Sequence, residues 1–248
     1  SAILIVYVMG RRKDACKLDL RKMHFHKAPL SKMLRIGVPA GIQSCTFSAS
    51  NVVLQSAVNS FGSIAVSGNA AVANLESFMY VIENSFHQTA VNFGGQNCGA
   101  MHYDRVKKIT VLCTVYAVIV GLLFGGLMCT FATQLLSVYI TDSPEAISIG
   151  IGRMYVSVLP YFLFGVQDVI TGALRGIGAS FISMVLSILG ICGIRLLWIA
   201  TIFRIPRFHT LSSLYLSYPL SWVVTFVAQI IAFVLIFRKM ERTHSDGV

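Results

Sequence analysis

The feature that most constrains this 248-residue sequence is a set of long apolar segments separated by short polar ones. The apolar segments cover residues 33–61, 64–93, 109–139, 146–173, 181–203 and 214–237. A helix needs about 20 residues to cross the hydrocarbon core of a bilayer, and each of these segments is longer than that. The sequence therefore predicts an all-α integral membrane protein, with residues 33–240 forming a bundle of six transmembrane helices.

Composition supports a membrane protein and argues against other classes. Only 12% of the residues are charged, about half the fraction found in soluble domains. The formal net charge is +10, but the basic residues lie beside apolar segments, so nucleic-acid binding is not predicted. The cysteines are Cys16, Cys45, Cys98, Cys113, Cys129 and Cys192. They form no CxxC pair and no cluster with histidine, so we expect reduced thiols, with no disulfide, metal site or cofactor.

The beginning of the chain combines a short apolar run with a strongly basic stretch. Residues 1–9 are too few to cross a bilayer, and a signal peptide carries its positive charge before the apolar part. We therefore interpret residues 1–9 as the end of a truncated transmembrane helix. Residues 10–32 are then a basic cytoplasmic connector, and residues 241–248 are a cytoplasmic tail.

The distribution of lysine and arginine predicts the orientation in the membrane. If the basic stretch before the first long helix is cytoplasmic and the helices alternate in direction, 16 of the 20 Lys and Arg residues face the cytoplasm. Only Arg204 and Arg207 lie in outer loops. Basic residues concentrate on the cytoplasmic side of membrane proteins. We therefore expect a multi-pass protein of the cell membrane, in contact with lipid, whose C-terminus is cytoplasmic.

Turn-forming residues separate several of the predicted helices. Gly62 and Ser63 suit a tight turn between the first two, and Pro144 follows Ser143 at the start of the fourth. Pro160 lies inside the fourth segment and is expected to bend it.

Several of the apolar segments, including the first two, carry polar residues at helical spacing. At 100° per residue, one set falls within roughly 80° of a helix face: Ser44, Ser48, Asn51, Gln55 and Asn59. A second set falls within roughly 60°: Asn69, Glu76, Tyr80, Glu83 and His87. Such residues either hydrogen-bond neighbouring helices or line a cavity. The cavity candidates that we select are Gln43, Asn51, Gln55, Asn69, Tyr80 and Tyr161.

Five ionisable residues lie within the predicted spans: Glu76, Glu83, Arg153, Asp168 and Arg195. Each costs at least about 2.5–3.5 kcal/mol at membrane depth, so such residues are usually paired or functional. Arg153 and Arg195 share the outer half of the membrane with Glu76 and are expected to be mainly structural, forming ion pairs with Glu76 or with substrate carboxylates. Glu83 and Asp168 lie deeper, without an arginine at their depth. Because burial without a cation favours a neutral acid, these two residues, together with Glu76, are the candidates for proton or sodium coupling.

Three short motifs resemble the multidrug and toxic compound extrusion (MATE) family of the MOP superfamily. They are Ile36-Gly37-Val38-Pro39-Ala40-Gly41-Ile42-Gln43, Gln96-Asn97-Cys98-Gly99-Ala100 and Gly172-Ala173-Leu174-Arg175-Gly176-Ile177-Gly178. The last motif follows no predicted strand and lacks the lysine of a P-loop, and no enzyme motif occurs elsewhere. A membrane transporter without enzymatic activity is therefore expected.

The resemblance implies two six-helix lobes around a central cavity. The chain would be the C-terminal lobe, and its partner an N-terminal lobe outside this chain. The family exports drugs, organic cations or metabolites by rocking of the two lobes in exchange for protons or sodium. Some members carry an acid midway along the helix that opens this lobe, whereas here Cys45-Thr46-Phe47-Ser48 contains none. Coupling would then use Glu76, Glu83, Asp168 or the other lobe.

Two alternatives remain open at this point. A flippase for lipid-linked or polysaccharide substrates belongs to the same superfamily, and a larger and more basic cavity would favour it. A seven-helix membrane receptor would require an N-terminus outside the cell, which the charge distribution contradicts.

Overall fold

The computed structural model describes residues 2–11 and 26–245, and its regular elements within these ranges are all helices. The chain separates into two compact units, Ser1–Arg35 and Ile36–Val248. The first unit contains α1 (Ala2–Arg11), which forms in the apolar run at the start of the chain. Residues 12–25, which include Cys16 and most of the predicted connector, lie outside the described residues, as do residues 246–248 of the predicted tail.

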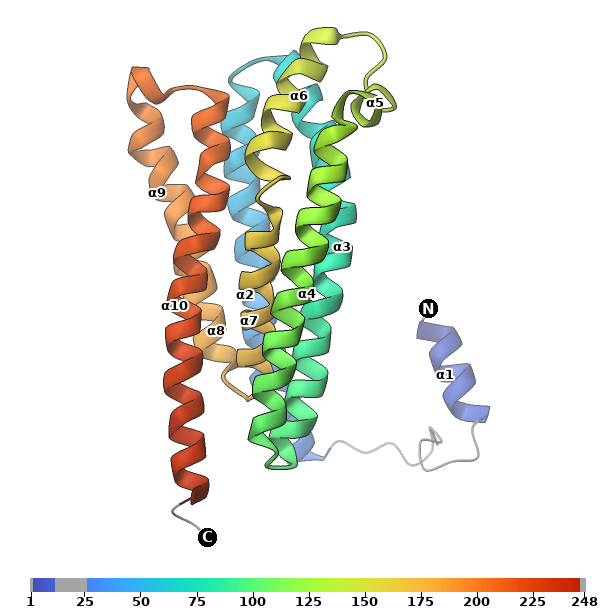
Figure 1. The fold of residues 1–248 in the computed structure, drawn as a ribbon, viewed down its shortest axis with the longest axis vertical. Helices are drawn as coiled ribbons and strands as arrows, with labels where there is room; N and C mark the ends of the chain where they lie inside the picture. The colour runs from blue at the N-terminus through green and yellow to red at the C-terminus, as the bar shows by residue number, and fades with distance from the viewer. Residues whose placement is uncertain (1, 12–25, 246–248) are drawn as a thin grey trace. The chain divides into compact units, whose positions relative to one another are not determined.

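The second unit is the helical bundle shown in Figure 1. Its α-helices are α2 (Lys27–Asn59, which begins in the first unit), α3 (Ser63–Gly99), α4 (Tyr103–Thr130), α5 (Ala132–Ser137), α6 (Pro144–Ser157), α7 (Tyr161–Gly176), α8 (Ser180–Ser187), α9 (Ile194–Ala200) and α10 (Leu211–Ser245). A π-helical segment, η2 (Ile188–Gly193), joins α8 to α9. Two 3₁₀ turns, η3 (Ile202–Arg204) and η4 (Pro206–Phe208), precede α10.

Successive spans of the bundle alternate in direction, as predicted. The α3–α4 turn, the α7–α8 turn and the C-terminal end of α10 lie at one end of the bundle (Figure 1). The α2–α3 turn, the α5–α6 connection and the α9–α10 connection lie at the other. An ion pair of 2.7 Å between Lys107 Nζ and Glu241 Oε1 joins α4 and α10 at the first end. The predicted turn residues also take their expected places, because Gly62 has a φ of 89° and Ser143 Oγ caps α6 by accepting from the Ala146 backbone N–H.

Two of the spans are interrupted. α6 and α7 are bent by 47° relative to each other, at the break where Pro160 precedes the first residue of α7. This bend was expected, because proline cannot donate a hydrogen bond and its ring clashes with the preceding turn. The π-helical η2 between α8 and α9 was not predicted. It contains Gly190, where an added Cβ would overlap the side chain of Thr225 in α10, so the wide turn sits where two helices approach closely.

The spans differ in how apolar they are. Within the described residues, α4, the stretch Ser180–Arg204 and α10 are long and apolar enough to cross a membrane, and the bent pair of α6 and α7 counts as a fourth span. α2 and α3 have 33 and 37 residues, which is ample length, but they fall below the same hydropathy limit. The lower hydropathy of α2 and α3 agrees with the polar stripes that the sequence analysis finds on these two segments.

Small residues let α3 approach its neighbours closely. A Cβ added at Gly68 would lie 2.5 Å from the Ala146 carbonyl oxygen of α6, and one at Gly172 of α7 would lie 2.6 Å from the His87 carbonyl oxygen of α3. Large apolar side chains on α4, such as Val111 and Leu123, instead point outward and are exposed. Close helix contacts through small residues and an apolar exterior are typical of membrane bundles. The predicted all-α membrane fold is confirmed.

Candidate functional site: a charged pocket lined by five spans

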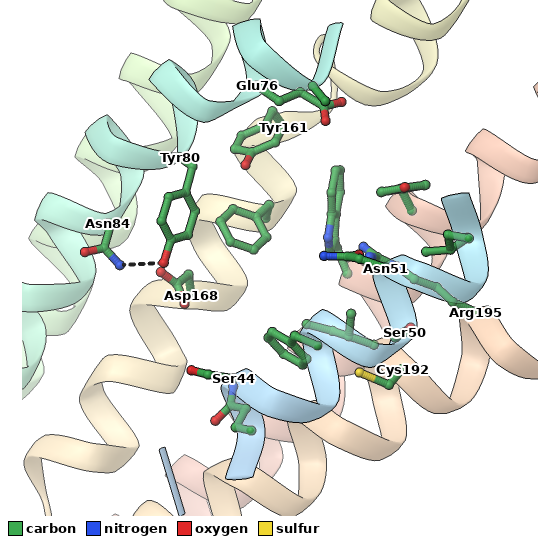
Figure 2. A pocket seen from close by; sticks show the side chains of 18 of the residues that line it. Ser44, Ser50, Asn51, Glu76, Tyr80, Asn84, Tyr161, Asp168, Cys192 and Arg195 are labelled. Atoms are coloured by element: carbon green, nitrogen blue, oxygen red, sulfur yellow. Dashed lines mark hydrogen bonds between the residues drawn. The ribbon is translucent and has the colours of Figure 1, made fainter. Parts of the chain in front are cut away.

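The second unit encloses a pocket of about 570 Å³. Side chains from α2, α3, α6, α7, α9, α10 and the segment η2 line it, and Figure 2 shows part of this lining. Along α2 the lining residues follow a regular helical stripe: Gln43, Ser44, Phe47, Ser50, Asn51, Leu54, Gln55 and Val58. The polar stripes that keep α2 and α3 from being uniformly apolar therefore meet at this pocket.

Glu76 of α3 is fully engaged in an ion-pair network. Arg153 Nη2 of α6 donates to Glu76 Oε2, and Ser157 Oγ donates to Glu76 Oε1 at 2.6 Å. The other terminal nitrogen of Arg153 donates to the Asn69 carbonyl oxygen at 2.7 Å and to the side-chain oxygen of Asn69. The Asn69 amide in turn donates to Gln55 Oε1 of α2 at 2.9 Å. Both charges of this buried pair are therefore compensated, as ionised groups at membrane depth require.

Asp168 of α7 has a partner that the sequence interpretation missed. His87 Nδ1 lies 3.2 Å from Asp168 Oδ1 and 2.8 Å from the Asp168 carbonyl oxygen. Arg175 Nη1 lies 3.5 Å from His87 Nε2, and its Nη2 donates to Gln43 Oε1 at 2.7 Å. Because arginine can only donate, His87 Nε2 accepts and Nδ1 carries the proton given to Asp168. We expected no arginine beside Asp168, and within the described residues its direct side-chain partner is the imidazole of His87, which Arg175 contacts in turn. The second carboxyl oxygen of Asp168, Oδ2, is nevertheless buried without a hydrogen-bond partner in the described residues.

Arg195 lies on a different wall of the pocket from Asp168 (Figure 2). Its side chain is only 7% exposed, and Nε donates to Ser221 Oγ of α10 at 3.1 Å. The guanidinium carbon lies 4.1 Å from the ring centre of Tyr218 and 5.9 Å from that of Trp222. Such contacts contribute about 2 kcal/mol when desolvated, less than the several kcal/mol that burying an ion costs. Within the described residues no carboxylate forms an ion pair with Arg195, so the predicted pairing with Glu76 is not present.

Aromatic rings make up much of the wall opposite α2. Tyr161 and Trp222 meet edge to face with ring centres 5.5 Å apart, and Phe164 lies between them and Tyr80. Asn84 Nδ2 donates to the Tyr80 hydroxyl at 3.4 Å, a contact drawn in Figure 2. Rings of this kind offer a large apolar surface with a few polar atoms, which suits amphipathic small molecules.

Glu83 lies outside the pocket lining, although the sequence grouped it with Glu76 and Tyr80. Its side chain is fully buried, and it lies against Gly121 of α4 and Gly165 of α7, where any added Cβ would overlap it. Neither carboxyl oxygen has a hydrogen-bond partner in the described residues. On an ideal helix Glu83 lies about 20° beyond Glu76, at the edge of the pocket-lining face of α3, and it faces the contact of α3 with α4 and α7.

The remaining predicted residues lie as follows. All six cavity candidates line the pocket, namely Gln43, Asn51, Gln55, Asn69, Tyr80 and Tyr161, and so do Glu76, Asp168, Arg153 and Arg195. Ser48 and Asn59, which the stripe on α2 includes, do not. The interpretation missed Arg175, which it counted as a cytoplasmic charge. A signal existed, because Tyr161, Asp168 and Arg175 recur every seven residues and therefore share one face of the helix.

The described residues offer no cluster of three or more His, Cys, Asp or Glu side chains that could hold a metal ion. The cysteines within the described residues are free thiols. Cys192 is among the pocket residues, beside Ser50 and Asn51 in Figure 2.

The fold and the pocket together define a class: a polytopic α-helical membrane protein in which charged residues from several spans surround one internal pocket. The chain belongs to the MatE family, because the model of that family matches residues 39–200, more than half of the chain. The family resemblance read from the sequence motifs is thereby confirmed.

Curated relatives and solved structures agree with the family. The chain is 26% identical over 247 residues to the probable multidrug resistance protein YoeA of Bacillus subtilis, covering 98% of this chain and 52% of the relative. It is similar in fold to the Vibrio cholerae MATE transporter VcmN in its bent form, with a TM-score of 0.81 at 17% identity, over 96% of this chain and 53% of that one. A MOP superfamily transporter from Pyrococcus furiosus, described as having a binding pocket of reverse polarity, gives a TM-score of 0.72 at 16% identity, over 86% and 46% of the two chains. The chain thus spans about half the length of the proteins it matches.

Proposed function

We propose that this chain is the C-terminal lobe of a secondary active antiporter. The protein would export drugs, organic cations or metabolites in exchange for protons or sodium, by rocking of two lobes in the cell membrane. The transported ion takes the place of a cofactor, and no enzymatic step or nucleic acid is involved. The printed name of the Bacillus relative, a probable multidrug resistance protein, supports efflux, and the basic end of the bundle supports a cytoplasmic C-terminus.

The observation that carries the coupling assignment is the half-engaged carboxylate of Asp168. One of its oxygens contacts His87, whereas Oδ2 is buried at the pocket without a partner in the described residues. A carboxylate in such a place gains from taking up a proton or a cation. Glu76 is a weaker candidate because Arg153 and Ser157 occupy both of its oxygens, and Glu83 lies outside the pocket lining.

The size of the pocket in this lobe suits a small-molecule substrate. About 570 Å³ falls in the range of 300–1,000 Å³ that is typical of sites for drug-sized ligands. A polysaccharide chain needs a longer groove. The receptor alternative has no support from the family.

The coupling proposal predicts that Asp168→Asn abolishes gradient-driven transport by the full-length protein at normal abundance. Asparagine keeps the shape and still accepts from His87, but it can carry neither a charge nor an exchangeable proton. The measurement is efflux of ethidium and of 2-naphthoate from proteoliposomes under an imposed proton or sodium gradient.

The matched control for this variant is Asp142→Asn, which makes the same change at an exposed residue before α6. It should transport like the wild type. Wild-type rates for Asp168→Asn across the pH range would remove Asp168 from the coupling mechanism and leave Glu76, Glu83 or the other lobe.

A further inference from the structure

The charges that line the pocket do not balance. Its acidic residues are Glu76 and Asp168, and its arginines are Arg153, Arg175 and Arg195. The Glu76 carboxylate is paired with Arg153, and Asp168 belongs to the group that contains His87 and Arg175. Neither Arg175 nor Arg195 forms an ion pair with a carboxylate of the described residues. The terminal nitrogens of Arg175 contact His87 and Gln43, whereas Arg195 has a hydrogen-bond partner only at Nε.

The local structure holds the Arg195 guanidinium in a defined position without neutralising it. Ser221 accepts a hydrogen bond only from Nε, and Tyr218 and Trp222 contact the guanidinium with the faces of their rings. The two terminal nitrogens have no hydrogen-bond partner among the described residues, and they remain accessible to the pocket. A fixed guanidinium with its forked edge free is the arrangement by which arginine binds carboxylate and phosphate groups with two parallel hydrogen bonds.

The surroundings of Arg195 indicate the rest of the ligand. Trp222, Tyr161 and Phe164 form a connected aromatic wall beside it, and an aromatic or apolar body can pack there while an acidic group reaches the guanidinium. From these observations we propose that Arg195 is an anion-binding residue and that the pocket accepts amphipathic compounds that carry a carboxylate, sulfonate or phosphate group on an aromatic body. This narrows the substrates of the proposed function from drugs, organic cations or metabolites to anionic amphipathic compounds, and it rests on the proposed function for the claim that bound compounds are exported.

A matched set of probes tests the proposal by equilibrium binding. The compounds are 2-naphthoate, 2-naphthamide and 2-naphthylmethylammonium, which share one ring system and differ in charge. Radiolabelled probes are titrated against the full-length protein in lipid nanodiscs, with empty nanodiscs correcting for partition into lipid. We expect the wild type to bind 2-naphthoate at least about tenfold more tightly than 2-naphthamide, and to bind the ammonium compound most weakly.

Substitution then locates the anion site. Arg195→Gln should weaken 2-naphthoate about tenfold or more and leave 2-naphthamide unchanged. Arg195→Lys, which keeps the charge but loses the planar fork, should weaken 2-naphthoate less. Arg195→Lys also provides the test if the glutamine variant does not fold. Thermal unfolding of each variant measures whether it is folded. Arg207→Gln removes the same charge at an exposed site in η4 and should bind all three probes like the wild type.

Two results would overturn the proposal. One is a wild type that binds the ammonium or the amide as tightly as the carboxylate. The other is unchanged 2-naphthoate binding in a folded Arg195→Gln or Arg195→Lys variant, which would mean that another group of the full-length protein compensates Arg195. Because binding at equilibrium needs no ion gradient, these results are independent of whether transport is coupled to protons or sodium.

Discussion

At the scale of single residues, the buried carboxylates of this bundle differ in how they are satisfied. Glu76 receives donors on both oxygens, and Asp168 receives a donor on one. Glu83 receives none among the described residues. Glu76 therefore belongs to a structural ion pair, Asp168 can take up a proton or a cation, and Glu83 is buried between helices.

Glu83 gives a prediction about stability. A charged carboxylate without hydrogen-bond donors in an apolar environment is costly, whereas an amide of the same shape carries no charge. Glu83→Gln is therefore expected to leave the thermal unfolding temperature of the full-length protein unchanged or higher. As a comparison, Glu76→Gln removes a charge from a compensated pair, leaves Arg153 without its counter-ion, and should lower that temperature. A lower unfolding temperature for Glu83→Gln would show that its charge is needed in the fold.

At the scale of elements, the departures from ideal helices decide where the charged groups lie. The bend at Pro160 separates Arg153 on α6 from Asp168 on α7, and the π-helical η2 comes directly before the helix that carries Arg195. Interruptions of this kind in membrane helices are tolerated where they border a cavity.

The element scale also explains what the sequence could and could not predict. Segment lengths and apolar content predicted the bundle, and the 100° helical repeat predicted many of the α2 and α3 residues that reach the pocket. Ser48, Asn59 and Glu83 lie on the same predicted stripes but do not line it. The position of Pro160 predicted the bend between α6 and α7. Nothing in the composition of residues 188–193 distinguishes a π-helix from an α-helix, because that choice depends on Gly190 fitting against Thr225 of another span. The pairing of His87 with Asp168 depends in the same way on how closely α3 approaches α7.

That close packing predicts the effect of adding a methyl group. Gly68→Ala would bring a Cβ within 2.5 Å of a backbone oxygen of α6, so α3 and α6 must separate. We expect a loss of about 1–3 kcal/mol in the free energy of unfolding. Gly126→Ala on α4 has nothing within 4 Å of the new Cβ and should be neutral or stabilising by about 0.5–1 kcal/mol. Equal unfolding free energies for the two variants, measured in the same detergent, would contradict this description of the α3–α6 contact.

At the scale of the whole molecule, the chain is a six-span membrane bundle of the MatE family that matches about half the length of its relatives. Its pocket combines an incompletely engaged carboxylate at Asp168 with an uncompensated guanidinium at Arg195. These two charges on different walls suit a cycle in which a coupling ion and a substrate use separate groups. Exchange across the membrane would then follow from the two lobes rocking around the pocket.

The central claim, antiport, is tested most directly by measuring the counter-ion itself. Full-length protein is reconstituted into proteoliposomes that contain dyes sensitive to protons and to sodium, and 2-naphthoate or ethidium is added outside. If the protein is an antiporter, substrate entry drives protons or sodium out of the liposomes, and neither empty liposomes nor the Asp168→Asn variant shows this movement. Substrate flux that proceeds at the same rate without either gradient and moves neither ion would contradict antiport.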